Sequence, residues 1–358
     1  MSYVRERLGN MSTVGLLMVM ALFLFVTIVI AISIGVVDIP LSVIYKILLY
    51  NITGISLGDP SILSSGTEFD IVWNIRAPRV FLAAVVGISL AMAGVVMQAT
   101  VQNPLADPYI LGMSSGASFG ATFAIAIGAS AIFTGALATT GIAVWAFVGS
   151  FVASIAVLGL SSAGGRMTSV KLVLSGVIIA SLFGAFSNLI VVMAADADEI
   201  QTLTYWMLGS FAAAQWYKIA IPLAAVIICG IYFITQIRSL NTMLMGDETA
   251  TTLGVDLAKK RKIYVFMTSI LTATAVCFCG VIGFVGLMIP HIVRGVTGNN
   301  HWKLLPISCL LGGIFMVWAD IVARTILGGG ELPIGIITAV CGAPIFAYIM
   351  IKKTYSFA

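Results

Sequence analysis

The chain has 358 residues, of which 60% are hydrophobic and only 9% are charged, whereas soluble domains carry about 25% charged residues. A soluble core of this length would need a polar surface that the sequence cannot supply, which excludes a soluble enzyme and a nucleic-acid-binding protein. The formal net charge of +4 comes from residues in short segments between long uncharged runs. Because about 20 apolar residues cross a bilayer, these runs predict an all-α, polytopic membrane protein.

Hydropathy and the positions of glycine and proline predict one domain, residues 1–358, with ten transmembrane helices. The first apolar run is longer than the core of a signal peptide and is expected to remain as the first helix. Short helices are expected in an outer loop, 38–75, and in the segment 196–215. The eighth span is short, and Pro290 is expected to interrupt it. In chain order, the predicted spans are 13–37, 79–101, 111–130, 140–163, 171–194, 216–237, 262–280, 282–297, 303–324 and 333–352.

Small residues recur at helical spacing in two places. Gly112, Gly116 and Gly120 are four residues apart, and another glycine series over 280–286 has a spacing of three. Small residues with such spacing let helices approach closely in lipid. We therefore expect these glycines to mediate helix packing rather than to bind a ligand.

The basic residues predict the orientation. Cytoplasmic loops of membrane proteins carry an excess of Lys and Arg. If both termini lie in the cytoplasm, 13 of the 18 basic residues face the cytoplasm, and the outer ones are Lys46, Arg76, Arg79, Lys218 and Arg324. This distribution predicts a multi-pass protein of the cell (inner) membrane with cytoplasmic N- and C-termini.

Signatures of catalysis are missing from the sequence. It has no GxxxxGK[ST] phosphate loop, so the chain is not expected to hydrolyse ATP or to act as an enzyme. Its five cysteines lie in apolar runs without a CxxC pair, and they are expected to be small core residues. No catalytic residue, metal site or cofactor is therefore predicted.

Short motifs give a more specific indication. They begin with Arg76-Ala-Pro-Arg79 and Asn103-Pro-Leu-Ala-Asp-Pro108, and they end with Ala319-Asp-Ile-Val-Ala-Arg324 and Glu331-Leu-Pro-Ile-Gly335. In their order and spacing over 70–352, the chain resembles the membrane permeases of binding-protein-dependent ABC importers for iron-siderophores, haem and cobalamin. The resemblance implies ten helices per subunit in a cobalamin-importer-like fold that functions as a dimer. The implied partners are a second copy of the chain, two cytoplasmic ATPase subunits that bind the ATP, an extracytoplasmic binding protein and membrane lipid.

The three outer arginines are the first candidate site. The resemblance implies that Arg76, Arg79 and Arg324 receive acidic residues of a docked binding protein, and the planar guanidinium suits such bidentate bonds. Alternatively, the arginines anchor helices at lipid headgroups. Asp320 lies four residues before Arg324 and either takes part in docking or only satisfies a buried arginine.

The longest inner loop, 240–261, is the second candidate site. Its sequence over 245–256 indicates two short helices broken at Gly254. Polar residues with a few apolar anchors suit a helix that sits in a partner's groove, and the resemblance implies an ATPase contact here. The alternative is a solvated loop. The coupling candidates are Asp247, Glu248, Thr251, Leu253 and Gly254.

A gate and a pathway complete the candidate sites. The resemblance implies a cytoplasmic gate at Asn103, Leu105, Thr168 and Ser169, although an asparagine before a proline is also typical of a turn cap. Small, weakly polar residues suit the wall of a pathway that must release its cargo. The predicted lining residues are Ser114, Ser115, Ser118 and Ser175.

Taken together, the motifs predict the permease subunit of an ATP-driven importer for a large metal chelate. The resemblance favours an Fe(III)-siderophore, then haem or cobalamin, with a molybdate-like oxyanion as an alternative cargo. An ion-gradient-driven secondary transporter is a second reading of many spans and broken helices. Such a carrier needs carboxylates near the midplane, and the predicted spans contain few charges. A receptor without transport is disfavoured because no signalling domain is present.

Overall fold

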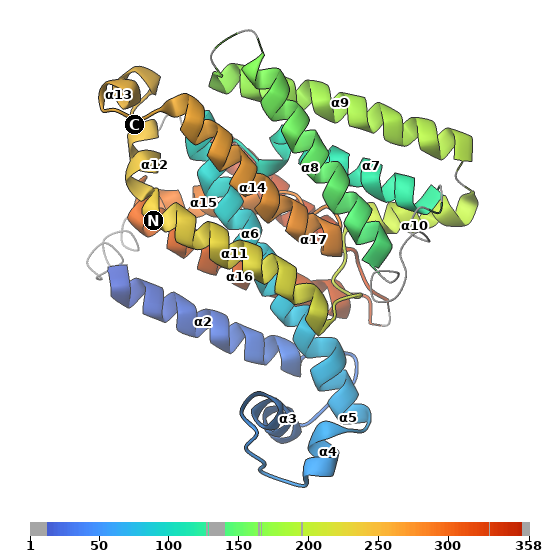
Figure 1. Ribbon diagram of the computed structural model, residues 1–358. Coiled ribbons are helices and arrows are strands. Elements are labelled where there is room, and N and C mark those ends of the chain that lie inside the picture. The colour runs from blue at the N-terminus through green and yellow to red at the C-terminus, as the bar shows by residue number, and fades with distance from the viewer. Residues whose placement is uncertain are drawn as a thin grey trace.

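A computed structural model describes residues 13–126, 128, 140–163, 165, 167–194, 196–328 and 330–352. Every regular element in these residues is a helix (Figure 1). Seven helical stretches of the described chain are long and apolar enough to cross a membrane. They are α2 (Thr13–Ser33), the continuous stretch Thr67–Val101 that contains α6 (Ala77–Val101), α8 (Gly141–Ser162), α9 (Ser169–Ala194), α11 (Trp216–Thr235), α14 (Leu257–Cys279) and α16 (His301–Thr325).

Shorter helices account for the remaining predicted spans and for the connections. The spans predicted at 111–130, 282–297 and 333–352 contain α7 (Met113–Ala126), α15 (Val285–Thr297) and α17 (Ile334–Lys352). The tail of the first of these, at 127 and 129–130, lies outside the described residues. The connecting helices are α3 (Leu41–Thr53), α4 (Pro60–Ser64), α5 (Thr67–Phe69), the π-helical η1 (Asp70–Arg76), the 3-10 helix η2 (Pro108–Leu111), α10 (Ala197–Leu208), α12 (Ile237–Met243) and α13 (Asp247–Thr252).

Helix α6 is the centre of the bundle. It is apolar on all sides, and 89% of its most apolar window is buried, compared with 22% for α2 and 17% for α9. A helix that is apolar all round is expected in the interior, and α6 packs on α16, α14, α15 and α11 (Figure 1). Arg79 lies in its first turn and Thr100 in its last. At 1.5 Å per residue these positions are about 30 Å apart, which matches the thickness of a bilayer core.

Glycines allow the closest helix contacts. A Cβ at Gly94 of α6 would lie 1.9 Å from the carbonyl oxygen of Gly286 in α15, and one at Gly87 would lie 2.2 Å from that of Gly312 in α16. A Cβ at Gly116 of α7 would lie 2.4 Å from a carbonyl oxygen of α8. The predicted packing role is confirmed for Gly116, Gly120 and Gly286 but is wrong for Gly283, where a Cβ would meet no atom within 4 Å. Gly112 instead ends η2 in the left-handed conformation, with φ +69°.

Two predicted breaks lie elsewhere. Helix α15 continues through Pro290, and the chain is instead broken before it, where Gly280 and Phe284 have φ values of +73° and +68°. In the inner loop, α12 and α13 are separated at Gly246 rather than at Gly254. Gly254 follows the end of α13, and α14 begins soon afterwards at Leu257. The four basic residues at 259–262 therefore belong to a long helix, although the predicted loop extends to 261.

Candidate docking, coupling and pathway sites

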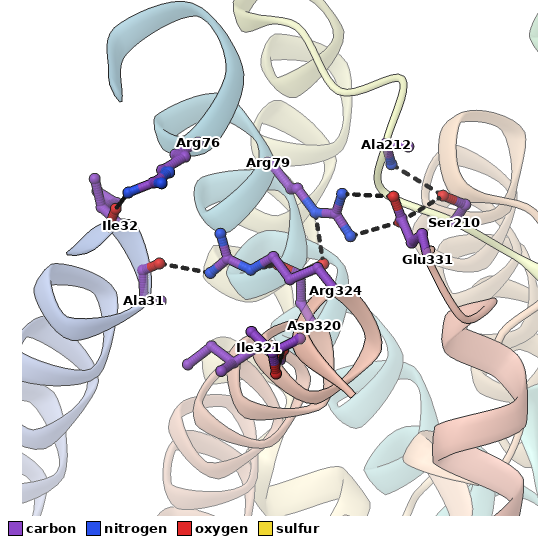
Figure 2. A network of polar contacts seen from close by, with 11 residues as sticks. Ala31, Ile32, Arg76, Arg79, Ser210, Ala212, Asp320, Ile321, Arg324 and Glu331 are labelled. Carbon is purple, nitrogen blue, oxygen red and sulfur yellow. Dashed lines mark hydrogen bonds and ion pairs between the residues drawn. The ribbon is translucent and has the colours of Figure 1, made fainter. Parts of the chain in front are cut away.

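The first turn of α6 directs Arg79 into a bidentate ion pair. Its Nη2 and Nη1 donate to Glu331 Oε1 and Oε2 at 2.6 and 3.0 Å, and its Nε donates to Asp320 Oδ1 at 2.8 Å (Figure 2). Ser210 also donates to Glu331, at 3.2 Å. Two carboxylates, both more than 240 positions away in the sequence, therefore accept hydrogen bonds from all three nitrogens of Arg79.

Arg76 and Arg324 hold the end of α2. Arg76 donates to the carbonyl oxygen of Ile32 at 3.2 Å, and Arg324 donates to that of Ala31 (Figure 2). Arg76 also donates to the carbonyl oxygen of Ser33 at 3.2 Å and to that of Val37. The last carbonyls of a helix have no partner within the helix, and α2 has no basic residue in its own last turn. Arg324 of α16 and Arg76 at the end of η1 therefore cap α2, and positive charge is favourable at a helix C-terminus.

We call Arg76, Arg79, Asp320, Arg324 and Glu331 the arginine cluster. Its three arginines are only 5–8% exposed and Asp320 is fully buried, with Arg324 Nε 3.5 Å from Asp320 Oδ2. The interpretation of Asp320 as the counter-charge of a buried arginine is confirmed. Three positive and two negative groups leave the cluster with one net positive charge. A docking role for its arginines stays a prediction.

The coupling candidates lie on or beside α13, at the other end of the bundle (Figure 1). Asp247 begins this helix, and its carboxylate oxygens accept from Arg261 Nη2 and Nη1 at 2.8 and 3.0 Å. Glu248, Thr251, Leu253 and Gly254 are exposed. Asp247 therefore points toward the protein, whereas the other four candidates form an open surface.

Two of the four gate candidates lie close to this helix. Thr168 lines a pocket of about 640 Å³ together with Asp247 and Arg261, and Ser169 accepts from Arg261 Nη2 at 3.0 Å. Asn103 is exposed and its side chain accepts from the backbone N–H of half-buried Leu105 at 2.9 Å. This bond confirms the interpretation of Asn103 as a turn cap, and its gate role stays a prediction.

Three of the four pathway candidates share one pocket. Ser114, Ser115 and Ser118 of α7 line a space of about 260 Å³ that α9 and α10 complete. No charged residue lines it, and its other polar residues are Thr122, Ser187 and Asn188. Ser175 is buried in α9 and does not line this pocket.

Two residues in these networks were not predicted from the sequence. Glu331 lies within one of the motifs, which predict no role for it, and Arg261 is predicted only as one of the 13 basic residues on the cytoplasmic side. A signal existed for Arg261, because it is the one arginine between three lysines and only arginine offers five donors in a fixed fork. For Glu331, the sequence shows nothing that pairs it with Arg79, which lies 252 positions away.

Long apolar helices, with charged networks at the two ends of the central one, define a multi-pass membrane protein. The chain belongs to the FecCD transport family, which it matches over residues 22–352.

Relatives agree with this membership. The chain is 40% identical over 280 residues to the cobalamin import system permease protein BtuC of Halobacterium salinarum, covering 78% of this chain and 73% of that protein. It is 34% identical to the hemin transport system permease protein HmuU of Yersinia pestis, covering 85% and 90% of the two chains. Its identity to the molybdate import system permease protein MolB of Haemophilus influenzae is also 34%, with 79% and 81% covered.

A solved structure has the same fold. It is an inward-facing conformation of a transporter assigned to the metal-chelate ABC type, with a TM-score of 0.78, 31% identity and coverage of 95% of this chain and 99% of that chain. PsaBC from Streptococcus pneumoniae is similar in fold alone, with a TM-score of 0.54 and 15% identity over 75% of this chain and 88% of that chain. The predicted resemblance to ABC importer permeases is thus confirmed.

Proposed function

We propose that this chain is the permease subunit of an ATP-driven importer that moves a large metal chelate from a binding protein into the cytoplasm by alternating access. One observation carries the proposal: charged networks lie at the two ends of a single buried helix, α6, about 30 Å apart. Each end is then available to a different partner. Membership of the FecCD family, whose relatives are ABC permeases, supports this arrangement.

The arginine cluster is the outer end in this proposal. The excess of basic residues at the opposite end favours cytoplasmic termini in the cell (inner) membrane. The functional unit is a pair of permease copies with ten spans each, two ATPase subunits that bind ATP, and one binding protein outside.

A bidentate bond between Arg79 and a docked carboxylate requires an exchange of carboxylates at the edge that Glu331 occupies. Glu331 accepts one hydrogen bond from each terminal nitrogen of Arg79 and so occupies the bidentate edge of the guanidinium. An acidic residue of the binding protein that takes this bidentate position displaces Glu331, whose side chain is 33% exposed while that of Asp320 is fully buried. Glu331 is thus the member of the cluster that can leave.

The open surface of α13 is the ATPase contact. Leu253 and Met245, at the two ends of this short helix, are each 62% exposed, and Glu248 and Thr251 lie between them. Apolar anchors around polar residues are suited to a groove in a partner protein. Deletion of 247–254 is expected to release the ATPase during purification while the permease stays folded, and retention of the ATPase would place the contact elsewhere.

The cargo passes a wall of hydroxyl and amide groups. Such groups bind a passing chelate weakly. The pocket lined by Ser114, Ser115 and Ser118 has no charged lining residue that would hold a small anion. Relatives named for cobalamin and hemin support a metal chelate as the cargo. An Fe(III)-siderophore is the third chelate to test beside these two. Molybdate is the alternative cargo because one relative is named for it.

The test is uptake into vesicles. Proteoliposomes with the permease, its ATPase and its binding protein are expected to accumulate one of cyanocobalamin, haem or a ferric siderophore only when ATP is present inside. Uptake that continues without ATP but requires an ion gradient would refute the proposal in favour of a secondary transporter. The structure offers such a carrier little support, because the carboxylate of Asp320 in α16 is paired with two arginines.

A further inference from the structure

Arg261 is a fully engaged buried arginine near the start of α14. Its side chain is 1% exposed, and it makes five hydrogen bonds. Arginine has five N–H donors, so the number of bonds equals the number of donors. Burial of a guanidinium is tolerated where its donors are satisfied and its charge is paired.

The partners of Arg261 belong to three other segments. Besides the two bonds to Asp247 of α13, its Nε donates to the carbonyl oxygen of Thr100 at 3.2 Å, and Nη1 donates to that of Met167 at 3.2 Å. Nη2 donates to Ser169 Oγ at 3.0 Å. We call these five residues the Arg261 junction. It joins α13 to the end of α6 and to the start of α9.

Few other interactions hold helix α13 to the rest of the protein. It is six residues long, and Ala250 is its one buried residue. It lies between Gly246 and Gly254, which have φ values of +99° and +84°. In the part of the chain that the structure describes, the bonds from Arg261 are the only side-chain hydrogen bonds between α13 and another helix. A short helix between two glycines can move as a unit, and the Arg261–Asp247 pair then moves with it.

The other side of the junction lies at the predicted gate. Met167 and Ser169 flank Thr168, and Thr100 precedes the turn that contains Asn103 and Leu105. The pocket of about 640 Å³ between α13 and this region is lined by Thr168, Asp247 and Arg261. A displacement of α13 thus has a direct bonded route to both gate segments.

We propose that Arg261 is the positioning residue that transmits movement of α13 to the start of α9 and the end of α6. The inference rests on the proposed ATPase contact at α13. Breaking a buried ion pair by removing one partner leaves an uncompensated charge and is strongly unfavourable. The bonded groups therefore shift together, or the ATPase supplies an acidic group that takes the place of Asp247 beside Arg261. The side chain of Asp247 is 42% exposed.

The test uses the permease–ATPase complex in nanodiscs with a thiol reporter at the gate. Leu105→Cys is introduced in a background in which the exposed Cys341 is replaced by serine. The rate of maleimide labelling is compared with and without ATP, alongside ATP hydrolysis and retention of the ATPase. The variants are Arg261→Gln and Asp247→Asn, with Lys262→Gln as the control, because Lys262 is an exposed neighbour of the same charge.

Arg261→Gln is expected to retain the ATPase and its hydrolysis but to reduce the ATP-dependent change in labelling rate by about 2- to 30-fold, the range seen for residues within coupling networks. Asp247→Asn should give a smaller reduction, and Arg261→Lys should restore part of the response because lysine keeps the ion pair but not the other bonds. An unchanged response in either Arg261→Gln or Asp247→Asn would overturn the inference.

The controls separate this inference from the proposed function. If Arg261→Gln does not fold, Asp247→Asn decides the outcome alone, since it leaves Arg261 and its three other bonds in place. If the deletion of 247–254 retains the ATPase, the proposed contact is wrong. If the deletion releases the ATPase and Asp247→Asn responds normally to ATP, the contact stands and the role of Arg261 is wrong.

Discussion

Glu331→Gln is expected to strengthen docking of the binding protein. Glu331 accepts from both terminal nitrogens of Arg79 at 2.6 and 3.0 Å, so an incoming carboxylate must compete with it. The amide keeps the size of the side chain and one acceptor oxygen but removes the negative charge. The arginine cluster then carries two net positive charges instead of one, while its buried arginines stay in place.

The size of the effect follows from the geometry. Hydrogen bonds to charged groups contribute about 1.5–3 kcal/mol each, but the Glu331 side chain is 33% exposed and solvent screens much of the difference between carboxylate and amide. About 1 kcal/mol remains after this discount, which corresponds to a roughly fivefold lower Kd. The gain should shrink at high salt, because screening weakens partly exposed charge pairs.

The assay measures binding-protein affinity for the transporter in nanodiscs at low and high salt. Asp198→Asn is a matched control, because Asp198 is an exposed carboxylate on α10 that caps nothing in that helix. Equal or weaker docking of Glu331→Gln, with unchanged thermal stability, would refute the reasoning. Glu331 would then only stabilise the fold through its ion pair with Arg79, and Arg79 would not receive the docking carboxylate.

Three further predictions concern stability, measured by SDS denaturation in mixed micelles. Asp320→Asn removes a buried counter-charge from two arginines and is expected to lower the free energy of unfolding by about 3 kcal/mol. Gly94→Ala places a Cβ 1.9 Å from a backbone carbonyl and should cost about 1–3 kcal/mol, whereas Gly159→Ala meets no atom within 4 Å and should cost nothing. Burial raises the pKa of Asp107 to about 6, so the folded state binds a proton more readily than the unfolded chain. The free energy of unfolding should therefore rise as the pH falls from about 7 to about 5, and Asp107→Asn should remove that rise.

The sequence predicts the helices and their close contacts better than it predicts the polar networks. Apolar runs and glycine spacing are local patterns, and they correctly indicated the long apolar helix α6 and the packing at Gly116. The partners of Arg79 and Arg261 lie 92 to 252 positions away, apart from Asp247 at 14. Scarcity of charge shows that such residues need partners, but only the packed helices determine which partners they have.

The predicted positions of the helix breaks were wrong for a related reason. A proline inside a helix removes one backbone bond, and the sequence alone cannot show whether packing compensates. In α15 the carbonyl oxygen that Pro290 leaves without its usual partner is that of Gly286, which lies directly against Gly94. Likewise, Gly246 and Gly254 both have positive φ, and the sequence did not indicate which of them separates two short helices.

Glycine contacts also limit how the two ends of the bundle can communicate. Helix α6 meets α16 and α15 through backbone contacts at Gly87 and Gly94, and α7 meets α8 in the same way at Gly116. Close-packed backbones leave little room for bending, so such helices move as rigid groups with sliding or rotation between them. If docking and ATP binding are coupled as proposed, α6 carries the signal over its length as one body. The adjustable parts are then its polar ends: the exchangeable Glu331 at Arg79, and the Arg261 junction at Thr100.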